Sequence, residues 1–326
     1  MRLPRPLDIL CCAGAAAALL SASWFLPLLG PALGLLTPLP FVYYGVKRGP
    51  LEGAMVGAGA FVVVSLAAGI LGLDRAPYLC AEFGFLGLVL AELYRRNLGV
   101  GPVVALGTAA MLAFGMMFLA AAAARHGLAP WDLVQGYFRE NLLSALTAHD
   151  AGGVEGAAEI SGYGRALVRV IDWVYPSLVV VGGGTAVWVN VLLSRPLLRT
   201  AGLPTPELGR LDLWRAPERL IWVFIAAGFA LFLPWEGVRF AAVNVLVVVS
   251  AVYCFQGLSI LRFYLEKYRA PRLLRAAIYF VILIQQFFLA GLALAGLIDQ
   301  WADFRKRAGE RGPRTYSRRD ENEDNS

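Results

Sequence analysis

Long apolar stretches alternate with short segments that carry pairs of basic residues along most of the chain. A helix needs about 20 apolar residues to cross the hydrocarbon core of a bilayer, and stretches of about that length predict up to nine crossings. Their approximate limits are 8–28, 32–46, 51–73, 77–94, 99–124, 174–194, 218–234, 238–261 and 276–298. The pattern predicts an all-α fold, a polytopic transmembrane helical bundle of eight or nine spans.

The second stretch differs from the others because it is short and contains Pro31, Pro38 and Pro40. Proline interrupts the hydrogen-bond ladder of a helix, and a broken helix is tolerated in a membrane where neighbouring helices shelter it. We therefore expect this segment to be broken or tilted.

Basic residues in the connections predict the orientation, because they gather on the cytoplasmic side of a membrane protein. With the N-terminus inside, the pair Lys47-Arg48 and the basic cluster at 262–275 also lie inside. This predicts a multi-pass protein of the bacterial cytoplasmic (inner) membrane with a cytoplasmic N-terminus. A ninth span would place Arg305 and the basic residues after it outside. Either one candidate does not span, the second being the first suspect, or the tail departs from the rule.

Two polar regions interrupt the apolar pattern. The region 126–173 is long for a connection, and Trp131, Val134 and Phe138 recur in it at helical spacing. It is predicted to be an extracytoplasmic loop region whose amphipathic helix lies on the membrane surface or caps a cavity, or simply fills the interface without a ligand. Residues 308–326 lack apolar periodicity and are predicted to be a disordered polar tail.

Composition agrees with a membrane protein: 58% of residues are hydrophobic and 16% are charged, against about 25% charged in soluble domains. The mean hydropathy is +0.62. The net charge of +6 comes from basic residues between apolar runs, which indicates contact with the lipid bilayer and argues against nucleic acid as a partner. The first residues also imitate a signal peptide, but the apolar run continues past Trp24, which favours an uncleaved helix.

Ionisable and amide side chains inside the spans are the candidate site residues, because a charge in lipid is costly unless it is paired. Glu82 lies in the fourth stretch and Tyr78 one turn before it, so both side chains can face one cavity. Glu82 is a candidate ligand-binding or proton site; an ion pair with Arg75 or a hydrated helix end is the alternative. Asn190, in the sixth stretch, is a candidate for lining a cavity or for an interhelical hydrogen bond.

No residue pattern predicts catalysis, a metal site or a cofactor. The four cysteines lie inside apolar runs without CxxC spacing, and His126 and His149 lack metal-ligand spacing. The glycine run 182–184 lacks the Lys and the Ser or Thr that complete a phosphate-binding loop. We expect no enzymatic activity, and any uphill transport would need an ion gradient or another subunit.

Two segments carry a resemblance to a known family. Residues 38–49, PLPFVYYGVKRG, and residues 296–307, GLIDQWADFRKR, are similar to those of the YybS-like bacterial membrane proteins. The resemblance covers about residues 8–307. That family is known only as a domain of unknown function, so the resemblance implies a membrane protein and carries over no catalytic residue.

Residues 1–194 also resemble the substrate-binding (S) component of energy-coupling-factor transporters. They share a small-residue first helix, a short proline-containing second segment and a helix with Gly53 and Gly57. The resemblance implies a six-helix unit formed by 1–125 and 174–194, and it implies that Ala13 and Ala17 dock on an energy-coupling module. Residues 195–307 are then a C-terminal membrane unit of about three helices.

Two hypotheses of function follow. In the first, the protein is transporter-like and binds a small solute from the outer side, with Glu82 and Tyr78 near the pocket. In the second, it is a non-transporting membrane scaffold or assembly factor whose helix-packing faces recruit other membrane proteins.

Overall fold

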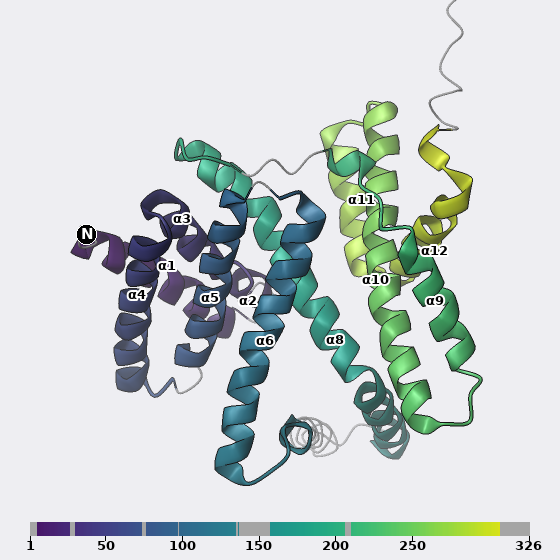
Figure 1. Ribbon diagram of the computed structural model, residues 1–326, viewed down its shortest axis with the longest axis horizontal. Coiled ribbons are helices and arrows are strands. Elements are labelled where there is room, and N and C mark those ends of the chain that lie inside the picture. The colour runs from purple at the N-terminus through teal and green to yellow at the C-terminus, as the bar shows by residue number, and fades with distance from the viewer. Residues whose placement is uncertain are drawn as a thin grey trace, which may run out of the picture. The chain divides into compact units, whose positions relative to one another are not determined.

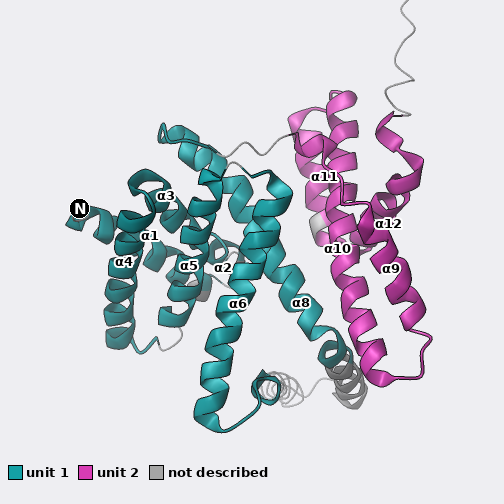
Figure 2. Cartoon of the chain, viewed as in Figure 1, with its two compact units in different colours: residues 1–209 teal, residues 210–326 magenta. Residues whose placement is uncertain are grey.

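The computed structural model describes residues 5–26, 30–73, 76–96, 98–134, 136, 157–205 and 210–306. Within these residues every regular element is a helix (Figure 1), so the all-α prediction is confirmed. The chain divides into two compact units, Met1–Gly209 and Arg210–Ser326 (Figure 2). The border between them lies in the polar connection that follows the sixth predicted span.

Unit 1 contains seven helices among its described residues, and several begin and end where the sequence signals it. Pro6, Pro38 and Pro50 stand in the first turns of three helices, where the missing N–H costs nothing. Gly72 ends the last of these three, and Gly127 ends the helix of residues 100–126, both in the left-handed conformation. The helices are α1 (Pro6–Phe25), α2 (Gly30–Gly34), α3 (Pro38–Arg48), α4 (Pro50–Leu71), α5 (Ala76–Arg95), α6 (Val100–His126) and α8 (Ala157–Thr200).

Unit 2 is built around one long helix, α10, against which α9 and α12 pack. A short 3-10 turn precedes α9 and lies against α10. The elements are η1 (Leu211–Leu213), α9 (Arg219–Ala230), α10 (Glu236–Lys267), α11 (Arg272–Ile284) and α12 (Gln286–Ala302).

Six helices in the described part of the chain are long and apolar enough to cross a membrane: α1, α4, α5, α6, α8 and α10; the bent pair α11 and α12 would make a seventh. The number is slightly below the eight or nine predicted. The second predicted span forms two short helices, and the seventh forms α9, whose 12 residues extend only about 18 Å.

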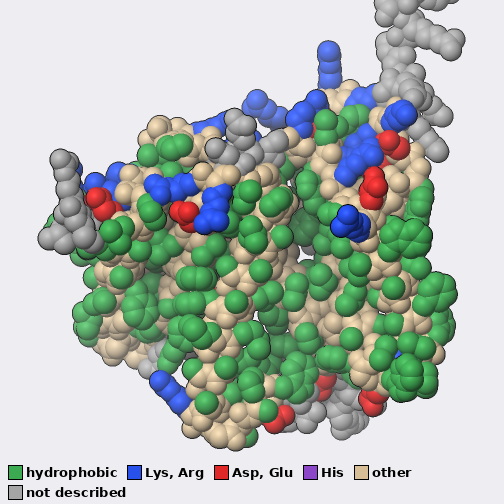
Figure 3. All heavy atoms as spheres, in the orientation of Figure 1, with side chains coloured by type: hydrophobic (Ala, Val, Ile, Leu, Met, Phe, Trp, Pro, Cys, Tyr) green, Lys and Arg blue, Asp and Glu red, His purple; other side chains and the backbone are tan. Residues whose placement is uncertain are grey.

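The surfaces of both units suit a lipid environment. Hydrophobic side chains cover the middle of each unit, and Lys and Arg gather toward one end (Figure 3). Large apolar side chains stand fully exposed, among them Ile70 at 86%, Phe232 at 87% and Phe287 at 83%. Extended exposed apolar surface of this kind indicates contact with lipid.

The second predicted span is broken, as the prolines predicted. α2 starts against the end of α1, since an added side-chain carbon at Gly30 would lie 2.5 Å from the carbonyl oxygen of Ser23. α3 ends against the start of α1, where Arg48 binds Asp8 in an ion pair. The segment therefore runs back along α1 from one end to the other, as two short helices with a break at 35–37.

Glycines let α3 lie deep between α4 and α5. A side-chain carbon at Gly87 of α5 would come within 2.6 Å of the Pro38 carbonyl oxygen, and one at Gly53 of α4 would come within 2.7 Å of Gly45 Cα. Small residues allow such close approach of helix backbones, which is the main attractive contact available in lipid. The broken helix is thus sheltered by its neighbours.

The ninth predicted span forms two helices with a sharp bend between them. α11 and α12 meet at 103°, and α11 starts directly after α10 ends. The residues that follow α12 return to the same part of α10: the Tyr264 hydroxyl donates to the Phe304 carbonyl at 3.1 Å, and Arg305 donates to the Ser259 hydroxyl at 3.3 Å. Because both ends of the pair lie toward the C-terminal end of α10, the pair has the shape of a re-entrant hairpin.

Arg305 contacts Ser259 in the C-terminal part of α10, the end of that helix that carries the basic cluster at 262–275. A re-entrant pair would keep these basic residues on one side of the membrane and would remove the conflict over orientation. The second segment, which we suspected first, runs along the full length of α1. Neither of its two helices is among the six that are long and apolar enough to cross a membrane, so the suspicion of the second segment stands. The ninth segment adds a seventh span only if its bent pair of helices counts as one span.

Candidate functional site

The two residues predicted to flank a pocket, Glu82 and Tyr78, lie on the face of α5 that packs against α6. The Tyr78 ring meets the Phe118 ring edge to face, with centroids 6.0 Å apart. Glu82 Oε1 lies over Gly115 of α6. A side-chain carbon added at Gly115 would be 3.4 Å from this oxygen. The glycine thus leaves the space that the carboxyl group occupies.

Aromatic rings extend on both sides of Glu82 along this interface. Phe118 contacts Phe114 with centroids 5.0 Å apart, and Phe114 stacks on Phe85 at 4.3 Å. With Tyr78 these rings form a continuous row between α5 and α6, which we call the ring row. Glu82 stands four residues after Tyr78 and three before Phe85, so its carboxyl group lies beside the row.

The carboxyl group of Glu82 lies inside a span and is half-buried. Within the described residues it has no ion pair and no hydrogen bond; Arg75, the alternative partner, lies outside them. By contrast, Glu92 at the other end of α5 pairs with Arg95 and Arg96 at 3.9 and 3.6 Å. Among the described residues, Glu82 is therefore the carboxylate of α5 that has no basic partner.

Asn190 is placed elsewhere, at the break between α2 and α3. Its side-chain amide is fully buried and donates to the carbonyl oxygens of Leu35, at 2.7 Å, and Ala186, at 2.8 Å. The break frees the Leu35 carbonyl, and a buried carbonyl in a membrane needs a donor. Asn190 thus makes the interhelical hydrogen bond that was the alternative to a role in a cavity.

The structure buries Ala13, one of the two residues predicted to dock on a partner. Its side chain is 1% exposed, in a core cluster with Cys12 and Val56, and Ala17 packs at the edge of that cluster. Ala13 has no surface to offer a partner. The outward face of α1 consists instead of other small residues at helical spacing, namely Cys11, Gly14, Ala15 and Ala18.

Unit 2 contains a buried ionic cluster that sequence reasoning did not identify. Asp299, near the end of α12, and Arg305, just beyond it, pair at 2.8 Å with their side chains 0% and 4% exposed. Asp299 also accepts from Gln256 of α10 at 2.9 Å and from the Phe304 N–H at 2.9 Å. We call Asp299, Arg305 and Gln256, with Ser259, the α10–α12 polar cluster.

The cluster ties three segments together. Arg305 donates to the carbonyl oxygens of Asp212 and Trp214 at 3.2 and 3.0 Å, and Gln256 accepts from the Ala216 N–H at 3.0 Å. These bonds satisfy backbone groups of the η1 turn that would otherwise be buried unpaired. Asp299 and Arg305 both lie in the segment 296–307 that carried the family resemblance. That resemblance was the one feature of the sequence that could have pointed to the cluster.

Two further ion pairs flank the cluster outside the membrane-spanning segments. Burial raises the pKa of Asp303, but the hydrogen bond and the positive charge of Arg215 outweigh it, so its pKa lies below the ordinary value. Burial likewise opposes the effect of Arg210 on Asp212, whose pKa is also lowered on balance. Within the described residues no three His, Cys, Asp or Glu side chains come together as metal ligands.

Comparisons with known proteins agree on one relationship. The family model described as "Predicted membrane protein (DUF2232)" matches residues 14–300. The uncharacterized protein YybS of Bacillus subtilis (strain 168) is 23% identical over 290 residues, which cover 87% of this chain and 91% of that protein. No solved structure matches, and the likeness to S components stays a prediction. The family match spans both membrane units, and the chain belongs to the DUF2232 family of predicted membrane proteins, the YybS-like proteins.

Proposed function

We propose that unit 1 binds a small solute that carries a positive charge, and that Glu82 anchors it. The observation that supports this is the carboxyl group of Glu82, which lies within a span over Gly115 and beside the ring row and has no partner among the residues that the structure describes. A charge in that position is costly without a partner. A bound cation offsets the cost, and no described side chain does so.

The neighbouring rings favour the same class of solute. Aromatic faces attract cations by about 0.5–2 kcal/mol, and the ring row of Tyr78, Phe118, Phe114 and Phe85 lies along both sides of the carboxyl group. A carboxylate with aromatic walls is suited to a protonated or quaternary amine. The carboxylate would repel an anion, and the faces of the rings would not attract it.

We further propose that the solute enters from the outer side of the cytoplasmic (inner) membrane. The basic ends of α3 and α5, with Lys47, Arg48 and Arg95, are expected to face the cytoplasm. Glu82 lies six residues, or about 9 Å, from the opposite end of α5. Uptake would then require an ion gradient or a partner subunit, since no nucleotide-binding motif occurs in the sequence.

The experiment is a thermal-shift assay on the full chain in mild detergent with a panel of small organic cations. Glu92→Gln is the matched control, because it removes a carboxylate of the same helix that already has basic partners. A compound that stabilises the wild type and Glu92→Gln, but not Glu82→Gln, supports the proposal. Equal stabilisation of all three proteins removes Glu82 from the site.

A scaffold is the second candidate, and the outward small-residue face of α1 favours it. Gly14 has no atom within 4 Å of an added side-chain carbon, so this face is open to another helix. Purification from native membranes distinguishes the two roles. A stoichiometric membrane partner that is lost in Gly14→Leu supports the scaffold, whereas a cation-binding protein without such a partner supports the solute-binding role.

A further inference from the structure

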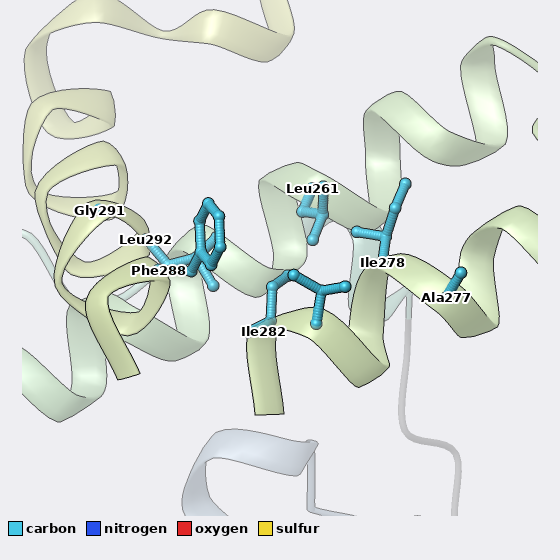
Figure 4. A pocket seen from close by; sticks show the side chains of 8 residues that line it. Leu261, Ala277, Ile278, Ile282, Phe288, Gly291 and Leu292 are labelled. Carbon is cyan, nitrogen blue, oxygen red and sulfur yellow. The ribbon is translucent and has the colours of Figure 1, made fainter. Parts of the chain in front are cut away.

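The re-entrant hairpin of unit 2 encloses an apolar groove, which is independent of the proposed solute site. The groove lies between the two arms of the hairpin and the C-terminal part of α10 (Figure 4), with a volume of about 460 Å³. All eight residues that line it are apolar. They include Leu261 of α10, Ala277, Ile278 and Ile282 of α11, and Phe288 and Leu292 of α12.

The size and chemistry of the groove suit a hydrocarbon chain. A methylene group takes up about as much space as a water molecule, roughly 30 Å³, so the groove accommodates on the order of 15 methylene groups. It opens toward the lipid-facing surface, where Phe280 and Phe287 are 63% and 83% exposed. A polar solute would find no hydrogen-bonding group on the lining.

Basic residues lie next to the lining residues along the chain, at the end of α10 and the start of α11. Five of them, with Glu266 as the one acidic residue, occur between residues 262 and 275. Arg262 follows the lining residue Leu261, and Arg275 precedes Ala277 by two residues. The Tyr279 hydroxyl lies within electrostatic range of both arginines.

Arg275 is the residue best placed to bind an anionic group. Its Nε donates to the Ala270 carbonyl at 2.8 Å, which fixes the guanidinium group at the start of α11. The structure gives its two terminal nitrogens no acceptor among the residues it describes. Arg262, in contrast, is held by Glu266 at 2.8 Å.

We propose that this groove binds an anionic phospholipid, with one acyl chain along the lining residues and the phosphate on Arg275. Basic pockets between membrane helices are suited to anionic lipid headgroups. Here the apolar groove and the free guanidinium donors lie within one helical turn of each other. The lipid would fill the space between α11 and α12 and hold the hairpin in its bent form.

The experiment is native mass spectrometry of the full chain in detergent, titrated with phosphatidylglycerol or with phosphatidylcholine of the same chains. We expect phosphatidylglycerol to bind more tightly. Arg275→Gln should lower its affinity about fivefold, the effect of one basic contact, without changing phosphatidylcholine binding. Arg239→Gln, which removes an exposed arginine at the other end of α10, is the matched control.

A second pair of variants tests the groove itself. Gly291 lines the groove, and nothing lies within 4 Å of an added side-chain carbon there, so Gly291→Leu fills the groove without a clash. It should weaken both lipids, while Gly228→Leu, also in open space on α9, should weaken neither. Equal binding of the two lipids to the wild type, equal loss in Arg275→Gln and Arg239→Gln, or full binding in Gly291→Leu would each overturn the proposal.

Discussion

The buried pair of Asp299 and Arg305 gives the sharpest test of how unit 2 is held together. Asp299→Asn keeps the shape of the side chain and removes its charge. The carboxylate accepts three hydrogen bonds, from Arg305 at 2.8 Å, from Gln256 at 2.9 Å and from the Phe304 N–H at 2.9 Å. The bonds from Arg305 and Gln256 share Oδ2, so an amide with its oxygen there can keep both, but its nitrogen then turns a donor toward the Phe304 N–H.

The expected cost follows from that count. One hydrogen bond to a charged group is lost, which is worth about 1.5–3 kcal/mol. The guanidinium of Arg305, only 4% exposed, is left as a buried charge without its partner, and breaking such a pair typically costs about 3–5 kcal/mol. We expect Asp299→Asn to lower the free energy of unfolding by about 3 kcal/mol or more.

The assay is unfolding in mixed detergent micelles, followed by tryptophan fluorescence. Asp303→Asn is the matched control: its pair with Arg215 is 35% and 47% exposed, so its loss should cost less than about 1 kcal/mol. Adding Arg305→Gln to Asp299→Asn should cost less than the sum of the single changes, because no charge is then stranded. If Asp299→Asn costs no more than Asp303→Asn, the α10–α12 polar cluster does not hold the unit together.

Three further predictions concern packing, the helix break and pH. Gly296→Ala should destabilise unit 2 by about 1–3 kcal/mol or more, measured by the same unfolding assay, because the added carbon would lie 2.0 Å from the Tyr253 carbonyl oxygen. Asn190→Ala should cost about 1–3 kcal/mol, measured by thermal unfolding, because it leaves the buried Leu35 carbonyl without its donor. The pKa of Asp303 is lowered in the folded state. Its ion pair should therefore stabilise the protein above the ordinary Asp pKa of about 3.9, and this contribution should be lost as the pH falls through the lower folded-state pKa. The difference in unfolding free energy between the wild type and Asp303→Asn, followed across pH, measures this contribution.

Each of the three predictions has a control variant or a result that would contradict it. Gly291→Ala, in open space on the same helix as Gly296, should be neutral or stabilising, and an equal loss in both would show that the contact is not the cause. Thr185→Val on α8 removes a hydrogen bond within one helix, so it should cost less than Asn190→Ala. A pH profile that Asp303→Asn leaves unchanged would assign the acid sensitivity to other groups.

Much of the helical architecture could be predicted from the sequence because the bilayer allows few solutions. A spanning segment must pair all its backbone groups internally and needs about 20 apolar residues, so most long apolar stretches mark helices of the right length. The prolines of the second segment predicted its break, because proline removes a backbone hydrogen bond within the helix that contains it. The four-residue spacing of Tyr78 and Glu82 fixed their common face, since one turn of helix separates them.

The sequence could not determine how these helices meet. The apolar stretch 276–298 has the length and composition of a span, and only the return of Phe304 and Arg305 to α10 reveals the re-entrant hairpin. Likewise, whether Asn190 lines a cavity or ties α8 to the break depends on which carbonyl lies opposite it. Hydropathy and spacing act along one chain, whereas the partner of a buried polar group comes from a distant segment, and only tertiary packing brings the two together.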